Sequence, residues 1–182
     1  MEPFPFRVGT TSYILPDDIL PNVHFLGGQV DDVELVLFEV DEGPSNLPDD
    51  ATLAQLGELA RQHQLSYTVH LPLDLRLGAE GQPQHVSLLK ARRVIECTRH
   101  LEPWAYVLHL DGKEVQQNAD AQALPRWRSQ SLKALELVSA WAGGADRLAV
   151  ENLEGYPPAF WEFLGDLPTQ CCVDVGHLWL DG

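Results

Sequence analysis

The hydrophobic positions of the chain fall into six short runs, which amphipathic stretches separate. Apolar runs of this length are typical of β-strands. The second run is nearly continuous in apolar character, as are strands that are buried on both faces of a parallel sheet. We therefore predict strands at residues 6–9, 33–40, 66–71, 105–110, 147–151 and 170–175.

The stretches between these runs have the spacing of amphipathic helices. Residues 49–64 place Leu56, Leu59 and Ala60 on one stripe, and residues 84–100 repeat the pattern. A third helix is expected from about residue 120 to Gly143, and a shorter one within residues 156–168. The alternation of strand and helix predicts a single parallel α/β domain over residues 1–182.

Two parallel architectures compete for this pattern. An open doubly wound sheet carries a Gly-rich loop after its first strand, but residues 9–13 (Gly-Thr-Thr-Ser-Tyr) have neither a dinucleotide-binding nor a P-loop pattern. A (β/α) TIM barrel instead collects its active residues from the C-terminal ends of several successive strands. The sequence has that second feature, so the predicted fold is a parallel (β/α) barrel.

The third to sixth predicted strands all end in residues that can bind a metal ion. These residues are His70, His109, Glu151, and Asp174 with the nearby His177. Strand ends lie about 5 Å apart in a sheet, so these side chains are expected to surround one point. Imidazole and carboxylate ligands suit Zn²⁺, with Mn²⁺ or Fe²⁺ as alternatives. One histidine at a strand end is usually structural, but four successive strands that end in such residues favour a shared metal or catalytic site. Glu151 and His177 are the candidates for catalytic residues.

Polar residues after the first two strands are candidates for substrate binding. Thr10, Ser12 and Tyr13 either line the pocket or serve turn chemistry, and Glu39 either contacts substrate or is a paired carboxylate. Glu154 and Asp111 lie just beyond ligand positions and could orient a histidine. The remaining histidines are expected to be solvated side chains: His24, His63, His85 and His100.

The charge balance constrains the partners of the protein. The chain has 12 basic and 27 acidic residues and a formal net charge of −15. Duplex nucleic acid is bound mainly through Lys and Arg, so we expect no nucleic-acid partner. A small anionic substrate remains compatible, because a bound metal supplies local positive charge.

Targeting signals and cysteine usage indicate a cytoplasmic protein. The chain has no apolar run long enough to span a membrane, and its N-terminus lacks the features of a signal peptide. The three cysteines, Cys97, Cys171 and Cys172, have the spacing of neither a disulfide framework nor a thiolate metal site.

The ligand pattern resembles the xylose-isomerase-like barrel superfamily, which includes sugar isomerases, sugar epimerases and DNA-repair phosphodiesterases of the endonuclease IV type. The pair His70 and His109 is most similar to the endonuclease IV arrangement. That resemblance implies that His70, His109 and Glu151 hold one metal ion. It also implies that Glu151 bridges to a second ion held partly by Asp174, and that His177 serves a third.

A narrower resemblance rests on residues 9–18, residues 33–39 and the segment His109-Leu110-Asp111-Gly112. These segments are similar to the cobamide-remodelling phosphodiesterase family CbiR. The resemblance implies cleavage of the nucleotide loop of a cobamide, with release of cobinamide phosphate.

The length departs from the expectation for a full barrel. Six strands occupy the 182 residues, whereas eight-stranded barrels typically need about 250. We expect either a chain cut from a longer protein after its sixth strand, or a partial barrel that covers its open edges by association, for example as a homo-oligomer.

Three functions follow as hypotheses. The first is metal-assisted phosphodiester hydrolysis, with His70, His109 and Glu151 holding the metal that activates water. The second is a metal-dependent sugar or sugar-phosphate isomerase or epimerase, in which Glu151 and Asp174 hold the metal and a carboxylate transfers the proton. The third is a non-catalytic barrel that binds a small molecule at its mouth.

Overall fold

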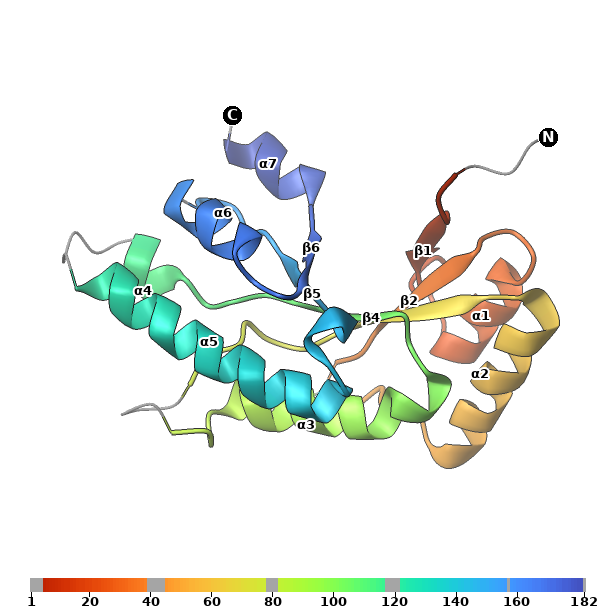
Figure 1. Ribbon diagram of the computed structural model, residues 1–182. Coiled ribbons are helices and arrows are strands. Elements are labelled where there is room, and N and C mark those ends of the chain that lie inside the picture. Colours follow the sequence, from red (N-terminus) through yellow and green to blue (C-terminus); the bar gives the residue numbers. More distant parts are fainter. Residues whose placement is uncertain (1–4, 39–44, 78–81, 117–121, 157, 182) are drawn as a thin grey trace.

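Six parallel strands form one sheet, and their order in the sheet follows the chain from β1 to β6. The computed structural model describes residues 5–38, 45–77, 82–116, 122–156 and 158–181. The strands are β1 (Gly9–Thr11), β2 (Asp32–Val36), β3 (Ser66–His70), β4 (Ala105–Leu108), β5 (Leu148–Glu151) and β6 (Gln170–Cys172). Figure 1 shows the sheet curving so that β1 and β6 form two edges raised on the same side. Sequential order, parallel pairing and curvature confirm the wall of a (β/α) barrel, since a doubly wound sheet reverses its order at a switch point.

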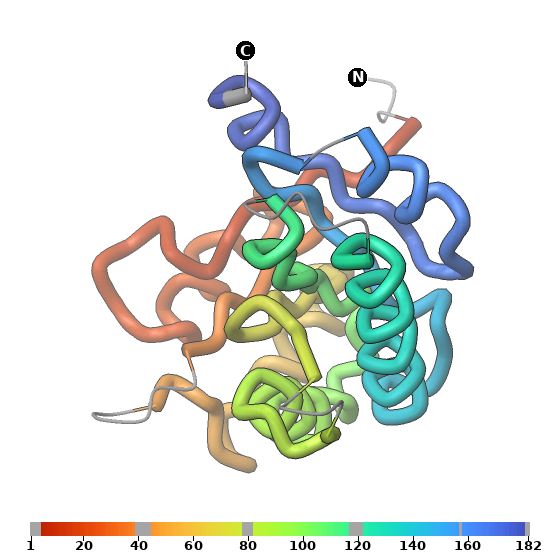
Figure 2. The backbone as a smooth tube through the Cα atoms, turned by 90° about the vertical axis from the view of Figure 1, so that its left-hand side faces the viewer, coloured from red at the N-terminus to blue at the C-terminus, as the bar shows by residue number. Residues whose placement is uncertain are grey.

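Helices pack along the convex side of this wall, and the last of them extends beyond the β6 edge (Figures 1 and 2). They are α1 (Ile19–Leu26), α2 (Asp50–His63), α3 (Val86–Thr98), α4 (Lys113–Gln116), α5 (Ala123–Ala142), α6 (Pro158–Gly165) and α7 (Val175–Asp181), with short 3-10 turns η2 (Arg99–Leu101) and η3 (Ala145–Arg147). Helices α2, α3, α5 and α6 lie where the periodicity predicts them, whereas it does not predict α1 and α7. None of the described helices is both long and apolar enough to cross a lipid bilayer.

Local capping explains where the predicted helices begin and end. The Asp49 carboxylate accepts the N–H of Thr52 at 2.8 Å and so caps the start of α2. The His85 ring accepts the N–H of Ser87 at the start of α3, so this histidine is a cap and not merely a solvated side chain. Helix α5 ends at Gly143, whose φ of 90° suits a residue without a side chain.

The two faces of the sheet differ in polarity. Residues that alternate along β2 and β3 point outward and are buried under the helices: Val33, Leu35, Tyr67 and Val69. The residues between them face the concave side and include Asp32, Glu34 and Thr68, which line a cavity of about 560 Å³ with residues from all six strands. The expectation that the second strand is apolar on both faces is therefore wrong.

Three strand boundaries differ from the predicted ones by three residues or more: the start of the first strand and the ends of the second and the sixth. The first two differences have identifiable reasons. The second strand stops at Val36, because the Asn46 side chain donates to the Val36 carbonyl and accepts the N–H of Phe38. These are the backbone groups that a longer strand would use for pairing. The first strand starts at Gly9, which pairs with Asp32, and the apolar residues before it are exposed. Hydrophobicity alone places that strand about three residues too early.

Candidate metal centre

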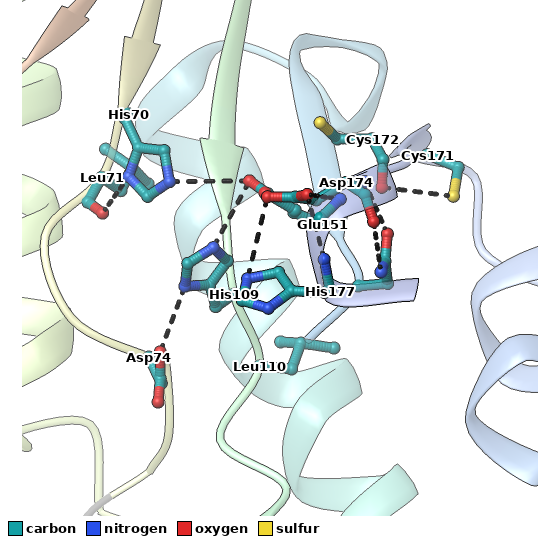
Figure 3. A network of polar contacts seen from close by, with 12 residues as sticks. His70, Leu71, Asp74, His109, Leu110, Glu151, Cys171, Cys172, Asp174 and His177 are labelled. Atoms are coloured by element: carbon teal, nitrogen blue, oxygen red, sulfur yellow. Dashed lines mark hydrogen bonds and ion pairs between the residues drawn. The ribbon is translucent and has the colours of Figure 1, made fainter. Parts of the chain in front are cut away.

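Glu151 lies at the end of β5 with only 8% of its surface exposed, and two histidines from neighbouring strand ends converge on it (Figure 3). Its Oε2 lies 3.5 Å from Nε2 of His70, the last residue of β3, and 3.3 Å from Nε2 of His109, just beyond β4. The two imidazole rings meet edge to face, with their centroids 4.9 Å apart. Three potential ligand atoms therefore surround one point at the C-terminal rim of the sheet.

The hydrogen bonds of both histidines leave Nε2 free to bind a cation. Nδ1 of His70 lies 3.0 Å from the carbonyl oxygen of Leu71, and Nδ1 of His109 lies 3.2 Å from the carboxylate of Asp74. Both partners are acceptors, so each Nδ1 carries the proton, and each neutral ring then directs the lone pair of Nε2 at Glu151. Nε2 of His109 is buried without a hydrogen-bond partner. Acceptor atoms that face one another need a proton or a metal ion between them.

The spacing of these atoms also suits a metal ion. Bonds of about 2.1 Å in a tetrahedron place neighbouring ligand atoms roughly 3.4 Å apart. The two separations from Glu151 to the histidines, 3.5 and 3.3 Å, lie on either side of that value. The donor set of two imidazoles and one carboxylate, together with its spacing, therefore fits a divalent cation such as Zn²⁺.

A second group of ligands shares Glu151 with the first. Ligand atoms of Glu151, Asp174 and His177 lie within 4.8 Å of one another. Asp174 follows β6, and both its backbone N–H and its carbonyl bond to the side-chain amide of the fully buried Asn152. His177 Nε2 lies 3.8 Å from Asp174, whereas its Nδ1 is 3.9 Å from Glu154 and has no hydrogen-bond partner. Glu154 is thus near a histidine, as expected, but does not bond to it.

Burial and the close charges shift the acid–base properties of the centre. Burial opposes protonation of His109, but the nearby carboxylates of Asp74 and Glu151 outweigh it and raise the His109 pKa to about 9. Burial alone would raise the pKa of Glu151, but the two histidine rings close to it, His109 and His70, hold it well below its usual range. Burial raises the pKa of Glu34, which lies on the concave side within electrostatic reach of these groups. The metal-free centre therefore pairs an anionic Glu151 with a protonated His109 at neutral pH.

Asp74, in the loop after β3, orients His109 and is not indicated by the sequence pattern. Its hydrogen bond to His109 is the largest cause of its lowered pKa, and Lys113 lies 3.7 Å from its other oxygen. Asp111 was expected to orient a histidine, but it instead accepts the N–H of Lys113 and pairs with Arg76 at 3.3 Å. Sequence position misleads here, because loop conformation decides which carboxylate turns towards the ring.

The expected substrate-binding residues occupy different places. Thr10 is half-buried and lines the cavity on the concave side. Ser12 is buried, and its hydroxyl accepts the N–H of Val36 at the end of β2. Tyr13 is exposed, and its ring meets that of Phe38 edge to face, with centroids 5.6 Å apart. Glu39 lies outside the described residues.

Fold and site together define a (β/α)-barrel protein with a candidate metal centre at the C-terminal ends of its strands. No protein-family model matches the sequence, and no curated protein matches it significantly. Solved structures are similar in fold. A D-tagatose 3-epimerase-like protein has 18% sequence identity and a TM-score of 0.67, and the match covers 95% of this chain and 66% of that one.

Two proteins from Thermus thermophilus are similar as well. Endonuclease IV has 21% identity and a TM-score of 0.64, with 97% of this chain and 65% of that one covered. The TTHB071 protein, studied in crystals soaked with zinc chloride, has 19% identity and a TM-score of 0.54, with coverage of 94% and 66%. The chain thus spans about two thirds of the length of these proteins. The similarity shows that the chain shares the TIM-barrel fold of these proteins.

Proposed function

We propose that this protein binds divalent metal ions at His70, His109 and Glu151, and at Glu151, Asp174 and His177, and that it hydrolyses a phosphodiester bond in a small molecule. The observation that carries the proposal is the position of Glu151, which belongs to both ligand groups. A carboxylate shared by two adjacent metal positions is a feature of two-metal phosphatases and nucleases. The fold shared with an endonuclease is in keeping with this chemistry.

A divalent ion bound there would supply Lewis acidity, which favours attack of water on phosphorus. The residues of the chain have separate roles in preparing the centre. The carboxylate of Asp74 holds the Nδ1 proton of His109, so that Nε2 stays directed at Glu151. Asn152 fixes the backbone of Asp174 and so positions its carboxylate beside His177. Zn²⁺ is the ion we expect, with Mn²⁺ or Fe²⁺ as alternatives.

The candidate substrate is the nucleotide loop of a cobamide, on the basis of the resemblance carried by residues 9–18, 33–39 and 109–112. An anionic phosphodiester would meet two sources of positive charge at the mouth, the bound ions and Lys113 beside Asp74. The chain itself carries a formal net charge of −15 and would repel an anionic substrate. Bound metal ions are therefore needed to attract the phosphodiester. Partners are therefore expected to be small molecules.

The proposal is tested by combining metal analysis with turnover. Purified protein loaded with Zn²⁺ or Mn²⁺ should hydrolyse bis(p-nitrophenyl) phosphate and release cobinamide phosphate from a cobamide. Glu151→Gln should lose metal from both positions and nearly all turnover, whereas Glu162→Gln, an exposed glutamate on α6, should retain both. Normal metal content and turnover in Glu151→Gln would contradict the proposal.

Sugar or sugar-phosphate isomerisation is the second candidate function. It is favoured by Glu34, a partly buried carboxylate with a raised pKa that could move a proton near Glu151, which belongs to both ligand groups. The fold shared with an epimerase-like protein is equally in keeping with it. Exchange of sugar C–H protons for deuterium in D₂O, followed by NMR, tests this activity.

His109 separates the two functions. In the hydrolase it is a direct metal ligand, so His109→Ala should lose metal and turnover together. In the isomerase, Glu151 and Asp174 would hold the ion, and the same variant should keep most of its metal. A protein that binds metal and a non-hydrolysable phosphonate, but turns over neither phosphodiesters nor sugars, would instead be a binding module.

A further inference from the structure

A separate cavity of about 300 Å³ opens beside the two histidines of the candidate metal centre. One part of its wall is polar and consists of His70, His109 and Asp74. The rest of the wall is apolar and comes from the end of β2 and the loop after β3: Val36, Leu37, Phe38, Leu71, Pro72 and Leu73. A ligand that fills this cavity would therefore place one end at the metal ligands and the other against hydrocarbon and aromatic side chains.

Leu73, in this wall, has an unfavourable backbone conformation. Its φ is 63°, in the left-handed region that favours glycine or asparagine, and half of its surface (50%) is exposed. The loop is pinned on both sides, since Leu71 N–H bonds to the Val107 carbonyl and Leu75 N–H bonds to the His109 carbonyl. A strained residue held in place by its surroundings is a feature of functional sites. An exposed leucine gains little from folding here, so its side chain is better explained by contact with a ligand.

Aromatic rings extend the apolar wall outward. Phe38 is 48% exposed and Tyr13 is 53% exposed, although the two rings contact each other. The Asn46 side chain accepts the N–H of Phe38 and donates to the Val36 carbonyl, which fixes the backbone that carries Phe38. Phe38, with the Tyr13 ring against it, and the strained Leu73 therefore offer a surface for a flat apolar group.

We propose that this cavity binds a one- or two-ring aromatic group that is attached to the phosphate held at the metal centre. The proposal rests on the proposed function, because the metal centre supplies the phosphate end. The volume of the cavity suits one or two rings, because engineered cavities of about 150 Å³ bind benzene and this cavity is about twice as large. A sugar would leave its hydroxyl groups unpaired against Phe38, Leu73 and Pro72, so the apolar wall disfavours it.

The test compares two small phosphonates that differ only in the apolar group. Binding of phenylphosphonate and methylphosphonate to the metal-loaded protein is measured by isothermal titration calorimetry. The phenyl compound should bind at least about tenfold more tightly, because its ring is removed from water. Leu73→Asn should abolish most of this preference while keeping the fold, because asparagine adopts the left-handed conformation readily. Leu73→Gly serves the same purpose if the asparagine variant does not fold.

The matched control is Leu89→Asn, which changes an equally exposed leucine on α3 outside this cavity and should keep the preference. Equal affinity for the two phosphonates, or no binding of either, would overturn the cavity assignment. A phenyl preference that Leu73→Asn leaves intact would overturn it as well. If the preference behaves as expected but no phosphodiester is hydrolysed, the cavity assignment stands and the proposed function fails.

Discussion

Asp74 should control how tightly the first metal position binds its ion. The carboxylate accepts the Nδ1–H of His109 at 3.2 Å and is the one side-chain partner on that edge of the ring among the described hydrogen bonds. Replacing it removes both a negative charge and the group that fixes the ring orientation. Because Asp74 sits outside the ligand set, its loss should weaken the site without eliminating it.

The expected magnitude follows from the two roles of the carboxylate. Partners that orient a metal ligand typically contribute 10- to 100-fold in metal affinity, or about 1.4 to 2.7 kcal/mol. Asp74→Asn keeps an acceptor oxygen and loses only the charge, and about a quarter of the Asp74 side chain is exposed to screening solvent. We expect Asp74→Asn to lose about tenfold and Asp74→Ala, which loses the acceptor as well, to approach 100-fold.

Competition with a chromophoric zinc chelator measures these affinities directly. Glu114→Gln is the control, because Glu114 carries an exposed negative charge and lies 3.9 Å from Arg76 but forms no ion pair with a histidine among the described residues. A second readout is the His109 pKa in the metal-free protein, which should fall from about 9 in Asp74→Asn when followed by NMR. Unchanged zinc affinity in Asp74→Ala, or an equal loss in Glu114→Gln, would refute the orienting role.

Three further predictions concern pH, nucleic acid and association. The His109 pKa of about 9 lies above the ordinary value of 6.5, so its proton stabilises the metal-free fold below pH 6.5, and this stabilisation is lost as the pH rises to about 9. Zinc must displace that proton, so its apparent affinity in titrations should rise about tenfold per pH unit up to about pH 9; a flat profile would contradict this. With a net charge of −15, the protein should not bind duplex DNA tightly at physiological salt, although a structural relative is an endonuclease; nanomolar, salt-dependent binding or cleavage of abasic DNA would show this to be wrong. Exposed apolar residues on α7, including Trp179 (84% exposed), should make these 182 residues self-associate, and sedimentation of a monomer at all concentrations would contradict that expectation.

The convergence of the candidate ligands could be predicted because it depends on strand ends alone. His70, His109, Glu151 and Asp174 each follow an apolar run, and parallel strands in sequential order must bring such ends together. That inference needs neither the exact strand limits nor the loop conformations. The inference therefore holds despite errors of about three residues at the start of the first strand, four at the end of the second and three at the end of the sixth.

The residues around the ligands could not be predicted because they depend on loops. Asp74 and Asp111 both lie just beyond predicted strands, and only the path of the loop after β3 turns Asp74 towards His109. Leu73 gives no signal in the sequence, since a left-handed backbone is expected at glycine or asparagine. Asn46 shortens β2 through a side chain ten residues from its carbonyl partner, which no local pattern indicates.

The burial of Glu151 imposes a last constraint on the centre. A carboxylate this buried is stable as an anion only beside positive charge. Neutral His70 and His109 cannot provide it, because their Nδ1 protons are directed at Leu71 and Asp74 and their Nε2 lone pairs face Glu151. A proton on His109 provides it in the metal-free protein, which is why burial fails to lower the pKa of that ring. A divalent ion would provide more charge at the same point, so proton and metal compete for one position, and the acidity of His109 sets the pH at which the metal prevails.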